Sequence, residues 1–169
     1  MPNYPNAAIA AHEYGHGLGL HHASFYNCPN APYLETGCDM TEYGSPYSVM
    51  GSHTNFGFFN ALEKDYLGWF APANIQTVTQ SGTYTLDHLE VASATNLKAL
   101  KFQRAANDYL YVEHRQPLQY DDNFTGTNAY NGALLHVRAN TGAGPLANRS
   151  FLLDAVHPPV WGTANDAAL

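Results

Sequence analysis

His12-Glu13-Tyr14-Gly15-His16-Gly17-Leu18-Gly19-Leu20-His21-His22 is the stretch of this sequence that decides its fold. Its first five residues have the spacing H-E-x-x-H. Residues four apart lie on one face of a helix, so a helix here places His12 and His16 within reach of a single metal ion. Glu13 follows the first histidine directly. We therefore expect its carboxylate beside the open coordination position, where it can accept a proton from a bound water.

The next six residues extend the pattern to H-E-x-x-H-x-x-G-x-x-H. A third ligand cannot lie on the same helical face and also close a tetrahedral site, so the chain must turn back. Gly19 permits a positive φ at that turn because it has no Cβ. His22 then approaches from the loop, and three neutral imidazoles leave the fourth position open for water, as a catalytic zinc requires. His21 is the rival third ligand, but the spacing favours His22 and places His21 outside the ligand set.

Together with a segment further along the chain, this pattern resembles the metzincin clan of zinc endopeptidases. Ser48-Val49-Met50-Gly51 looks like the clan's Met-turn, whose methionine, here Met50, forms a hydrophobic floor beneath the three histidines. The resemblance implies hydrolysis of peptide bonds in protein or peptide substrates, with Zn²⁺ as cofactor and Glu13 as general base.

Within the clan, the chain is most similar to the gametolysin-like group, with the immune inhibitor A-like proteases close behind. The similarity covers most of the chain and is most specific up to residue 69. It rests on His12 to Ala23, the Cys28/Cys38 loop, Glu42 to Gly51, Phe59 to Ala61, Lys64 to Trp69, Ser81 to Leu86, Tyr111 to Arg115 and Leu152 to Ala155.

The segment after the Met-turn bears on substrate recognition. Ser52 stands where some metzincins carry a tyrosine that reaches the zinc, so we expect no tyrosine switch. Tyr43 and Tyr47 lie nearby in the sequence but do not match that pattern. The pocket wall is expected over residues 52–59. Its aromatic residues, which favour an apolar pocket, are Phe56, Phe58 and Phe59.

Cys28 and Cys38, the two cysteines of the chain, flank a loop rich in Asn, Pro, Gly and Thr. An even number of cysteines in one short loop indicates a local disulfide, which is typical of secreted proteins. Two free thiols are the alternative. A second zinc site is less favoured, because four clustered ligands are not visible there.

The pattern along the chain predicts an α+β protein. A helix is expected over residues 6–19, capped by Asn3 or Asn6, and a second over 58–69. Residues 23–55 contain many Gly, Pro and Asn and are expected to be loop. The predicted strands cover 77–86 (strand, turn, strand), 97–102, 109–114 and 133–138. We therefore divide the chain into a metzincin catalytic subdomain, residues 1–72, and a β-rich, sandwich-like region, residues 73–169.

Composition excludes some partners. The formal net charge is −7 and the seven Lys and Arg are scattered, so nucleic acid is not an expected partner. No apolar run approaches the roughly 20 residues of a membrane span. Only 12% of the residues are charged, so the surface is solvated largely by uncharged polar side chains, a common feature of secreted proteins. Composition does not predict an oligomeric state.

The start of the chain departs from the clan. Metzincin catalytic domains have a twisted sheet before the zinc helix, whereas eleven residues precede His12 here. We therefore interpret the chain as an internal part of a longer secreted precursor, with its signal peptide upstream. Without that sheet, the helix face that carries Ile9 and Leu18 is expected to stay uncovered, and the chain as written is expected to be a poor protease.

The remaining polar candidates have simpler interpretations. Asp121-Asp122-Asn123 is expected to be a solvated loop, with calcium binding as the alternative. The histidines without a ligand-spaced partner, expected to be surface or hydrogen-bonded residues, are His53, His88, His114, His136 and His157. Two other functions stay open. The β-rich region alone could be an adhesion or carbohydrate-binding module, and the metal motif could be an inactive remnant.

Overall fold

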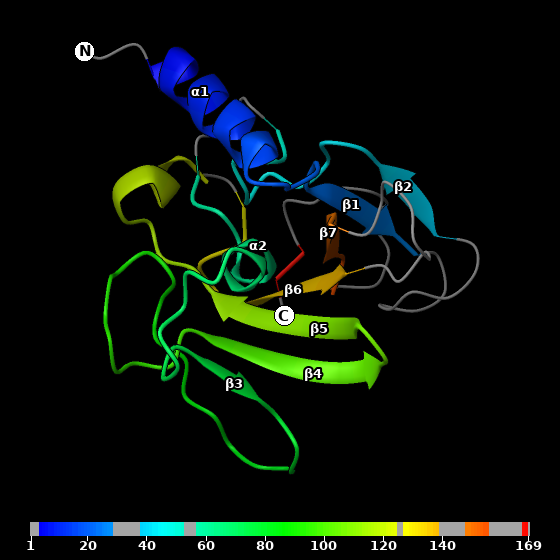
Figure 1. The fold of residues 1–169 in the computed structure, drawn as a ribbon, viewed down its shortest axis with the longest axis vertical. Coiled ribbons are helices and arrows are strands. Elements are labelled where there is room, and N and C mark those ends of the chain that lie inside the picture. Colours follow the sequence, from blue (N-terminus) through cyan, green and yellow to red (C-terminus); the bar gives the residue numbers. More distant parts are fainter. Residues whose placement is uncertain are drawn as a thin grey trace.

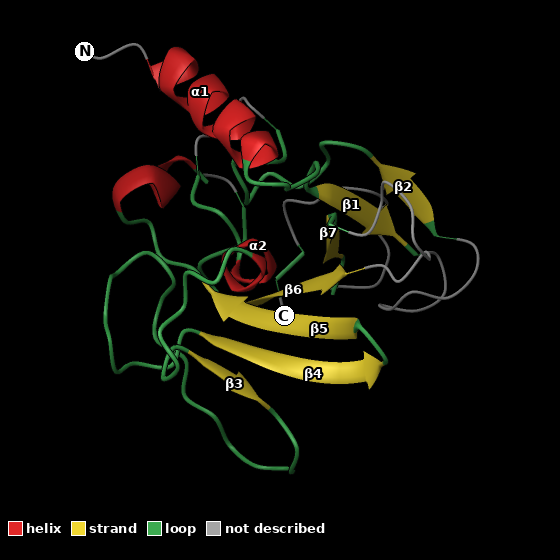
Figure 2. Cartoon of the chain, in the orientation of Figure 1, coloured by secondary structure: helices red, strands yellow, loops and turns green. Residues whose placement is uncertain are grey.

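The protein is mixed α and β, as the sequence predicts. The computed structural model describes residues 4–28, 38–52, 57–124, 127–138, 148–155 and 167–168. These ranges hold two α-helices, one 3-10 helix and seven strands, joined by long loops (Figure 2). In chain order they are α1 (Tyr4–Gly17), β1 (Ser24–Asn27), β2 (Asp39–Thr41), α2 (Ala61–Tyr66), β3 (Ile75–Thr77), β4 (Ala99–Ala105), β5 (Asp108–His114), the 3-10 helix η1 (Gln119–Asn123), β6 (Ala133–Arg138) and β7 (Ser150–Leu153).

The seven strands form one sheet in the order β2-β1-β7-β6-β5-β4-β3. The pairs β1–β7 and β3–β4 are parallel, and the other neighbours are antiparallel. Figure 1 shows α1 at one end of the molecule, β3 and β4 at the other, and α2 in the middle, where it contacts β5 and β6.

This single sheet corrects the sandwich-like arrangement predicted for residues 73–169. β1 and β2 come from the first part of the chain and extend the sheet that the later strands form. The β1–β7 pairing sets Phe25 beside Leu152, and both side chains are buried in one apolar cluster with Tyr47, Phe124 and Leu134. Leu135, Val137, Phe151 and Leu153 form a second cluster. Successive side chains of a strand face opposite sides of the sheet, so β6 and β7 are buried on both faces.

The segment predicted as loop, residues 23–55, contains β1 and β2. They form an antiparallel hairpin in which Asn27 pairs with Asp39. The next positions along the two strands are Cys28 and Cys38, and they are joined by the predicted disulfide, which is confirmed. By chain entropy, a crosslink that closes so short a loop contributes about 2–3 kcal/mol to stability. The short aromatic strand β1 was not predicted, because the surrounding sequence is rich in Gly and Pro.

The strand–turn–strand predicted over residues 77–86 is wrong beyond Thr77. Val78 donates one more hydrogen bond to the Lys101 carbonyl, and the chain then leaves the sheet. Tyr84 donates its hydroxyl to the Gln80 carbonyl and folds the segment back on itself. β3 is an edge strand of the sheet that the described residues form, so no further described strand pairs with this segment.

Both predicted helices exist, with shifted ends. Asn6 lies inside α1 and is not its cap, and Asn3 lies outside the described residues. α2 is shorter than predicted because Asn60 caps it, and Glu63 completes a capping box by accepting from the Asn60 backbone N–H. Among the described helices, none is long and apolar enough to cross a membrane. Leu18, just beyond the last turn of α1, is half-buried, and Ile9 within the helix is 48% exposed. The apolar side of the helix is therefore covered only in part.

A buried network of charged side chains joins the end of β5 to η1 and to the loop that contains Tyr47. Arg115 is fully buried. Its guanidinium donates to Glu113 Oε1 at 2.7 Å, to Asp121 Oδ2 at 2.5 Å and to the Tyr47 carbonyl at 3.1 Å. Tyr47 lies three residues before Met50, so this contact fixes the start of the segment that resembles a Met-turn.

The carboxylates of Glu113 and Asp121 also accept hydrogen bonds from the backbone at the start of α2 and just before it. Glu113 accepts from the Ala61 amide, and Asp121 Oδ1 accepts from the Phe58 amide at 2.9 Å. Burial alone would raise the pKa of Glu113, but the charges of Arg115 and His136 bring it down to about 2. Because this folded-state pKa lies below the ordinary 4.5, the stabilisation that it adds is present above pH 4.5 and is lost as pH falls toward 2.

We predict that Arg115→Met lowers the free energy of unfolding by about 3–5 kcal/mol, because it leaves two buried carboxylates without their cation. The matched control is Arg104→Met, which removes an ion pair with Asp108 from a side chain that is 30% exposed. Such surface pairs contribute about 0–1 kcal/mol. Urea unfolding of both variants measures the difference, and equal losses would contradict the role of Arg115.

Candidate metal centre

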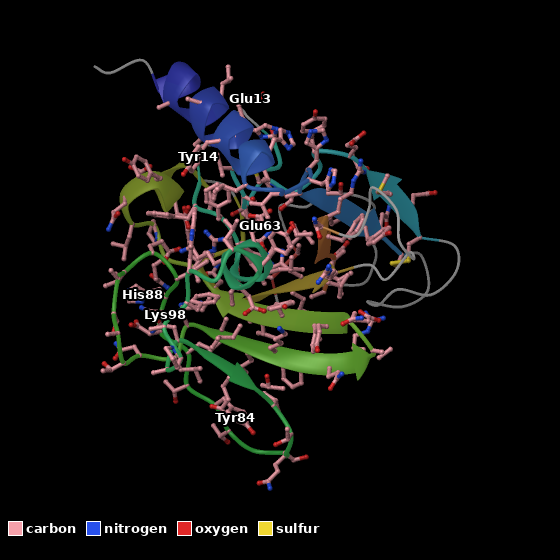
Figure 3. All side chains as sticks on the ribbon, viewed as in Figure 1. Glu13, Tyr14, Glu63, Tyr84, His88 and Lys98 are labelled. Carbon is pink, nitrogen blue, oxygen red and sulfur yellow. A yellow bond between two sulfur atoms is a disulfide. The ribbon has the colours of Figure 1, made fainter. Side chains whose placement is uncertain are left out.

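His12 and His16 lie on one face of α1, as their spacing predicts. Their ring centroids are 4.7 Å apart. His12 is buried and His16 half-buried. Glu13 projects from the exposed side of the same helix (Figure 3). The helix therefore supplies two neighbouring imidazoles and, on its exposed side, one carboxylate.

The turn after α1 has the conformation that the sequence predicts. Gly19 has φ +91°, in the left-handed region that favours glycine. The Gly19 amide donates to the His16 carbonyl at 2.9 Å and the Leu20 amide to the Gly15 carbonyl at 3.0 Å, which is a Schellman motif. The chain thus reverses at the end of the helix and enters β1.

His22 reaches the two helical histidines through this turn. Its ring centroid lies 4.9 Å from that of His16 and 5.5 Å from that of His12. One nitrogen from each of the three residues lies within 4.8 Å of the other two, so the cluster can hold a metal ion. Histidine nitrogens bind zinc at about 2.0–2.1 Å, so three imidazoles gathered this closely suit a single ion. His21 is not part of the cluster.

The other nitrogen of each ring is already engaged. His12 Nδ1 donates to the Val49 carbonyl at 2.8 Å and His16 Nδ1 to the Leu20 carbonyl at 2.9 Å. His22 Nδ1 donates to Glu42 Oε1 at 2.8 Å. A carbonyl oxygen can only accept, so these partners assign the proton to Nδ1 and leave a lone pair on each Nε2. This is the tautomer that a metal ligand needs.

The charge states at His22 also suit a ligand. Partial burial lowers the pKa of the His22 imidazole, and the neighbouring His16 and His12 lower it too, while the hydrogen bond that His22 donates to Glu42 opposes them. The pKa of Glu42 is itself lowered, mainly by the hydrogen bond that it accepts from His22. A neutral imidazole beside a charged carboxylate is the result at neutral pH.

Met50 packs under the helix between the two ligand positions. It is fully buried, in a cluster with Leu20, Ala23 and Val49. A Cβ built on Gly15 would lie 2.3 Å from Met50 Sδ, so the thioether touches the helix backbone where only a glycine fits. The neighbouring Val49 carbonyl is the acceptor for His12. The Met50 segment therefore supports the cluster by packing and by one hydrogen bond.

A buried glutamate fixes this segment from below. Glu63, in α2 at the middle of the molecule (Figure 3), accepts from Ser48 Oγ at 2.7 Å and from Ser150 Oγ at 2.9 Å. Ser48 Oγ in turn accepts from the Met50 amide at 3.0 Å. Burial raises the pKa of Glu63, and its hydrogen-bond donors oppose that rise.

A pocket of about 430 Å³ opens beside the cluster. Of the described residues, those that line it are Ile9, His12, Glu13, Tyr43 and Ser52. Ser52 is the first residue of the pocket wall predicted over 52–59. Phe58 packs instead on Tyr120, and Phe59 on Trp69. His53 and Phe56 lie outside the described residues, as does His157.

Sequence reasoning missed two residues of the site, Glu42 and Tyr43. Tyr43 does not match the tyrosine pattern of the clan, yet its ring stands over His22 with 3.7 Å between centroids. Glu42 lies twenty residues from His22 and carries no ligand spacing. The β1–β2 hairpin brings both residues to His22, and its register is not visible as a motif.

The remaining candidates have structural roles. Asp121 is fully buried with both oxygens engaged, so it is neither a solvated residue nor a free calcium ligand. His136 is fully buried, with Nε2 3.2 Å from Glu113. His114 bonds the Gly132 carbonyl, and His88 lies beside Asp87.

No family model, curated protein or solved structure matches the chain. The assignment of the site therefore rests on its own chemistry.

We predict that Gly15→Ala destabilises the protein relative to Gly17→Ala by about 1–3 kcal/mol, the usual cost of overpacking. Both changes add the same methyl group to α1. At Gly15 the Cβ meets Met50, whereas at Gly17 it meets nothing within 4 Å. Urea unfolding of the metal-free variants measures the difference. Equal stabilities would show that Met50 does not pack tightly on the helix.

Proposed function

We propose that this protein is a zinc-dependent endopeptidase that hydrolyses peptide bonds in protein or peptide substrates. The observation that carries the proposal is the arrangement of His12, His16 and His22. All three rings are held by Nδ1, which leaves a lone pair on each Nε2, and one nitrogen from each ring lies within 4.8 Å of the other two. Glu13 and His12 both line the pocket beside the cluster. Three imidazoles with an open position and an adjacent carboxylate form the donor set of a hydrolytic zinc site.

The chain's own residues have distinct roles in this mechanism. His12, His16 and His22 would hold the ion. When bound, zinc supplies a Lewis acid that lowers the pKa of water from about 15.7 toward about 7 and polarises a carbonyl. Glu13 accepts the proton of the attacking water and returns it to the leaving amine. The peptide bond and one water thus give a carboxylate and an amine.

The pocket supports a peptide as substrate. Ile9 and Tyr43 add apolar surface to its lining beside His12, Glu13 and Ser52. An apolar pocket with a few converging polar groups is the usual form of a ligand-binding site, in which the polar groups fix the orientation of the ligand. The Cys28–Cys38 disulfide is compatible with a secreted enzyme, because disulfides persist in oxidising compartments.

We predict that His22→Ala abolishes stoichiometric zinc binding, whereas His21→Ala retains it. The two histidines are adjacent, so the control differs by a single position in the chain. Calorimetric titration with Zn²⁺, together with elemental analysis after dialysis, measures the effect. Retention of zinc by His22→Ala and its loss from His21→Ala would reverse the ligand assignment.

We predict that Glu13→Gln binds zinc with the affinity of the parent and cleaves an unfolded protein substrate at least about 100-fold more slowly, the scale of a lost general base. Single-turnover assays at high enzyme concentration detect slow cleavage. Turnover by Glu13→Gln at the parent's rate would exclude Glu13 as the base. A parent that binds zinc but cleaves nothing would favour an inactive remnant, and a parent that binds no zinc would favour a non-catalytic binding module.

A further inference from the structure

Glu42 holds the third histidine with a side chain. His12 and His16 donate Nδ1 to backbone carbonyls, which no substitution removes. His22 donates instead to Glu42 Oε1 at 2.8 Å. Of the three rings, His22 is therefore the one whose orientation depends on the identity of another residue.

The β1–β2 hairpin and Arg149 both hold Glu42 in this position. Phe25 pairs with Thr41 in the hairpin, so the residue after Thr41 lies at the same end of the hairpin as His22. The disulfide closes the opposite end. From the other side Arg149, just before β7, donates Nη2 to the same Glu42 oxygen at 2.8 Å. Glu42 is thus fixed although its side chain is 43% exposed.

Tyr43 covers the face of the same imidazole. Its φ of +60° lies in the left-handed region, which a residue with a bulky side chain seldom adopts. That conformation follows Glu42 directly and sets the Tyr43 ring over His22. Strained conformations of this kind persist where the surrounding structure enforces them, often at functional sites. The turn after β2 therefore contacts the His22 ring twice, through Glu42 at the Nδ1 edge and through Tyr43 at the face.

We propose that Glu42 is a positioning residue of the metal centre. Its carboxylate keeps the His22 proton on Nδ1, aims Nε2 at the ion and strengthens that nitrogen as a donor. The inference rests on the proposed function, because it assigns Glu42 a role toward the metal that the three histidines hold. Arg149 anchors the carboxylate, and Tyr43 limits the rotation of the ring.

The first test measures metal affinity with Zn²⁺ and Co²⁺ alone on the full chain. Glu42→Ala is expected to weaken binding by about 10–100-fold, the usual effect of losing a ligand's outer partner. Glu42→Gln keeps an oxygen for Nδ1 but loses the charge, so its loss should be smaller. Asp39→Asn is the matched control, because it removes one carboxylate from an exposed position of the same hairpin. It should bind as the parent does, and the cobalt absorption spectrum should change in Glu42→Ala but not in Asp39→Asn.

The second test needs no metal. Nitrogen NMR of the imidazoles in the metal-free protein reports which ring nitrogen carries the proton. His22 should be a single Nδ1–H tautomer in the parent, in Glu42→Gln and in Asp39→Asn. In Glu42→Ala it should become a mixture, while His12 and His16 keep their tautomers.

The outcomes separate this inference from the proposed function. If the parent binds zinc and Glu42→Ala binds it equally well with an unchanged cobalt spectrum, the positioning role is overturned and the metal centre stands. If Glu42→Ala does not fold, Glu42→Gln decides: an affinity equal to that of Asp39→Asn overturns the role. If the parent binds neither ion, the proposed function fails and this inference fails with it, whatever the tautomer of His22.

Discussion

The burial of Arg115 is the constraint on which the rest of the site depends. A guanidinium without solvent must be surrounded by acceptors, and here they are Glu113, Asp121 and the Tyr47 carbonyl. Each acceptor belongs to a different part of the fold: a central strand, a 3-10 helix and the segment that leads to Met50. Satisfying one cation therefore fixes three elements together. Two residues beyond Tyr47, the Val49 carbonyl is the acceptor for His12, so the network reaches the metal cluster through a few peptide units.

The three histidines are supported in different ways, and this determines how the site can vary. His12 and His16 depend on the backbone of the Met50 segment and of the Gly19 turn, which tolerate many side chains as long as the chain path is kept. His22 depends on a carboxylate that the hairpin and Arg149 hold in place. The helical pair is therefore insensitive to side-chain changes that keep this chain path, while the orientation of His22 varies with the side chain at position 42. A site built in this way combines two rigid positions with one adjustable position.

The parts of the fold that could be predicted from the sequence are those set by local chemistry. The α1 helix, the positive φ of Gly19 and the Cys28–Cys38 bridge each follow from residues within one short stretch. The β1–β7 pairing could not be predicted, because it joins residues from opposite ends of the chain and β1 is only four residues long. Glu42 and Arg115 were missed for the same reason. Their partners are distant in sequence, and a single charged residue has no periodicity. The prediction for residues 77–86 was wrong for the opposite reason. Good strand formers occur there, but beyond Thr77 they have no neighbouring strand to pair with in the described part of the chain.

The cluster lies where two separately supported parts of the protein meet. α1 is covered only in part, with Ile9 half exposed, and it is held mainly through its last turns, where Gly15 packs on Met50 and His16 bonds the turn. His22 belongs instead to the segment that enters the sheet at β1. An ion shared by His12, His16 and His22 would therefore cross-link the helix to the sheet. Metal binding to a folded site adds to stability by mass action, and here that stabilisation would fall on a helix that is covered only in part. The metal would thus be a structural part of α1 as well as the centre of the chemistry.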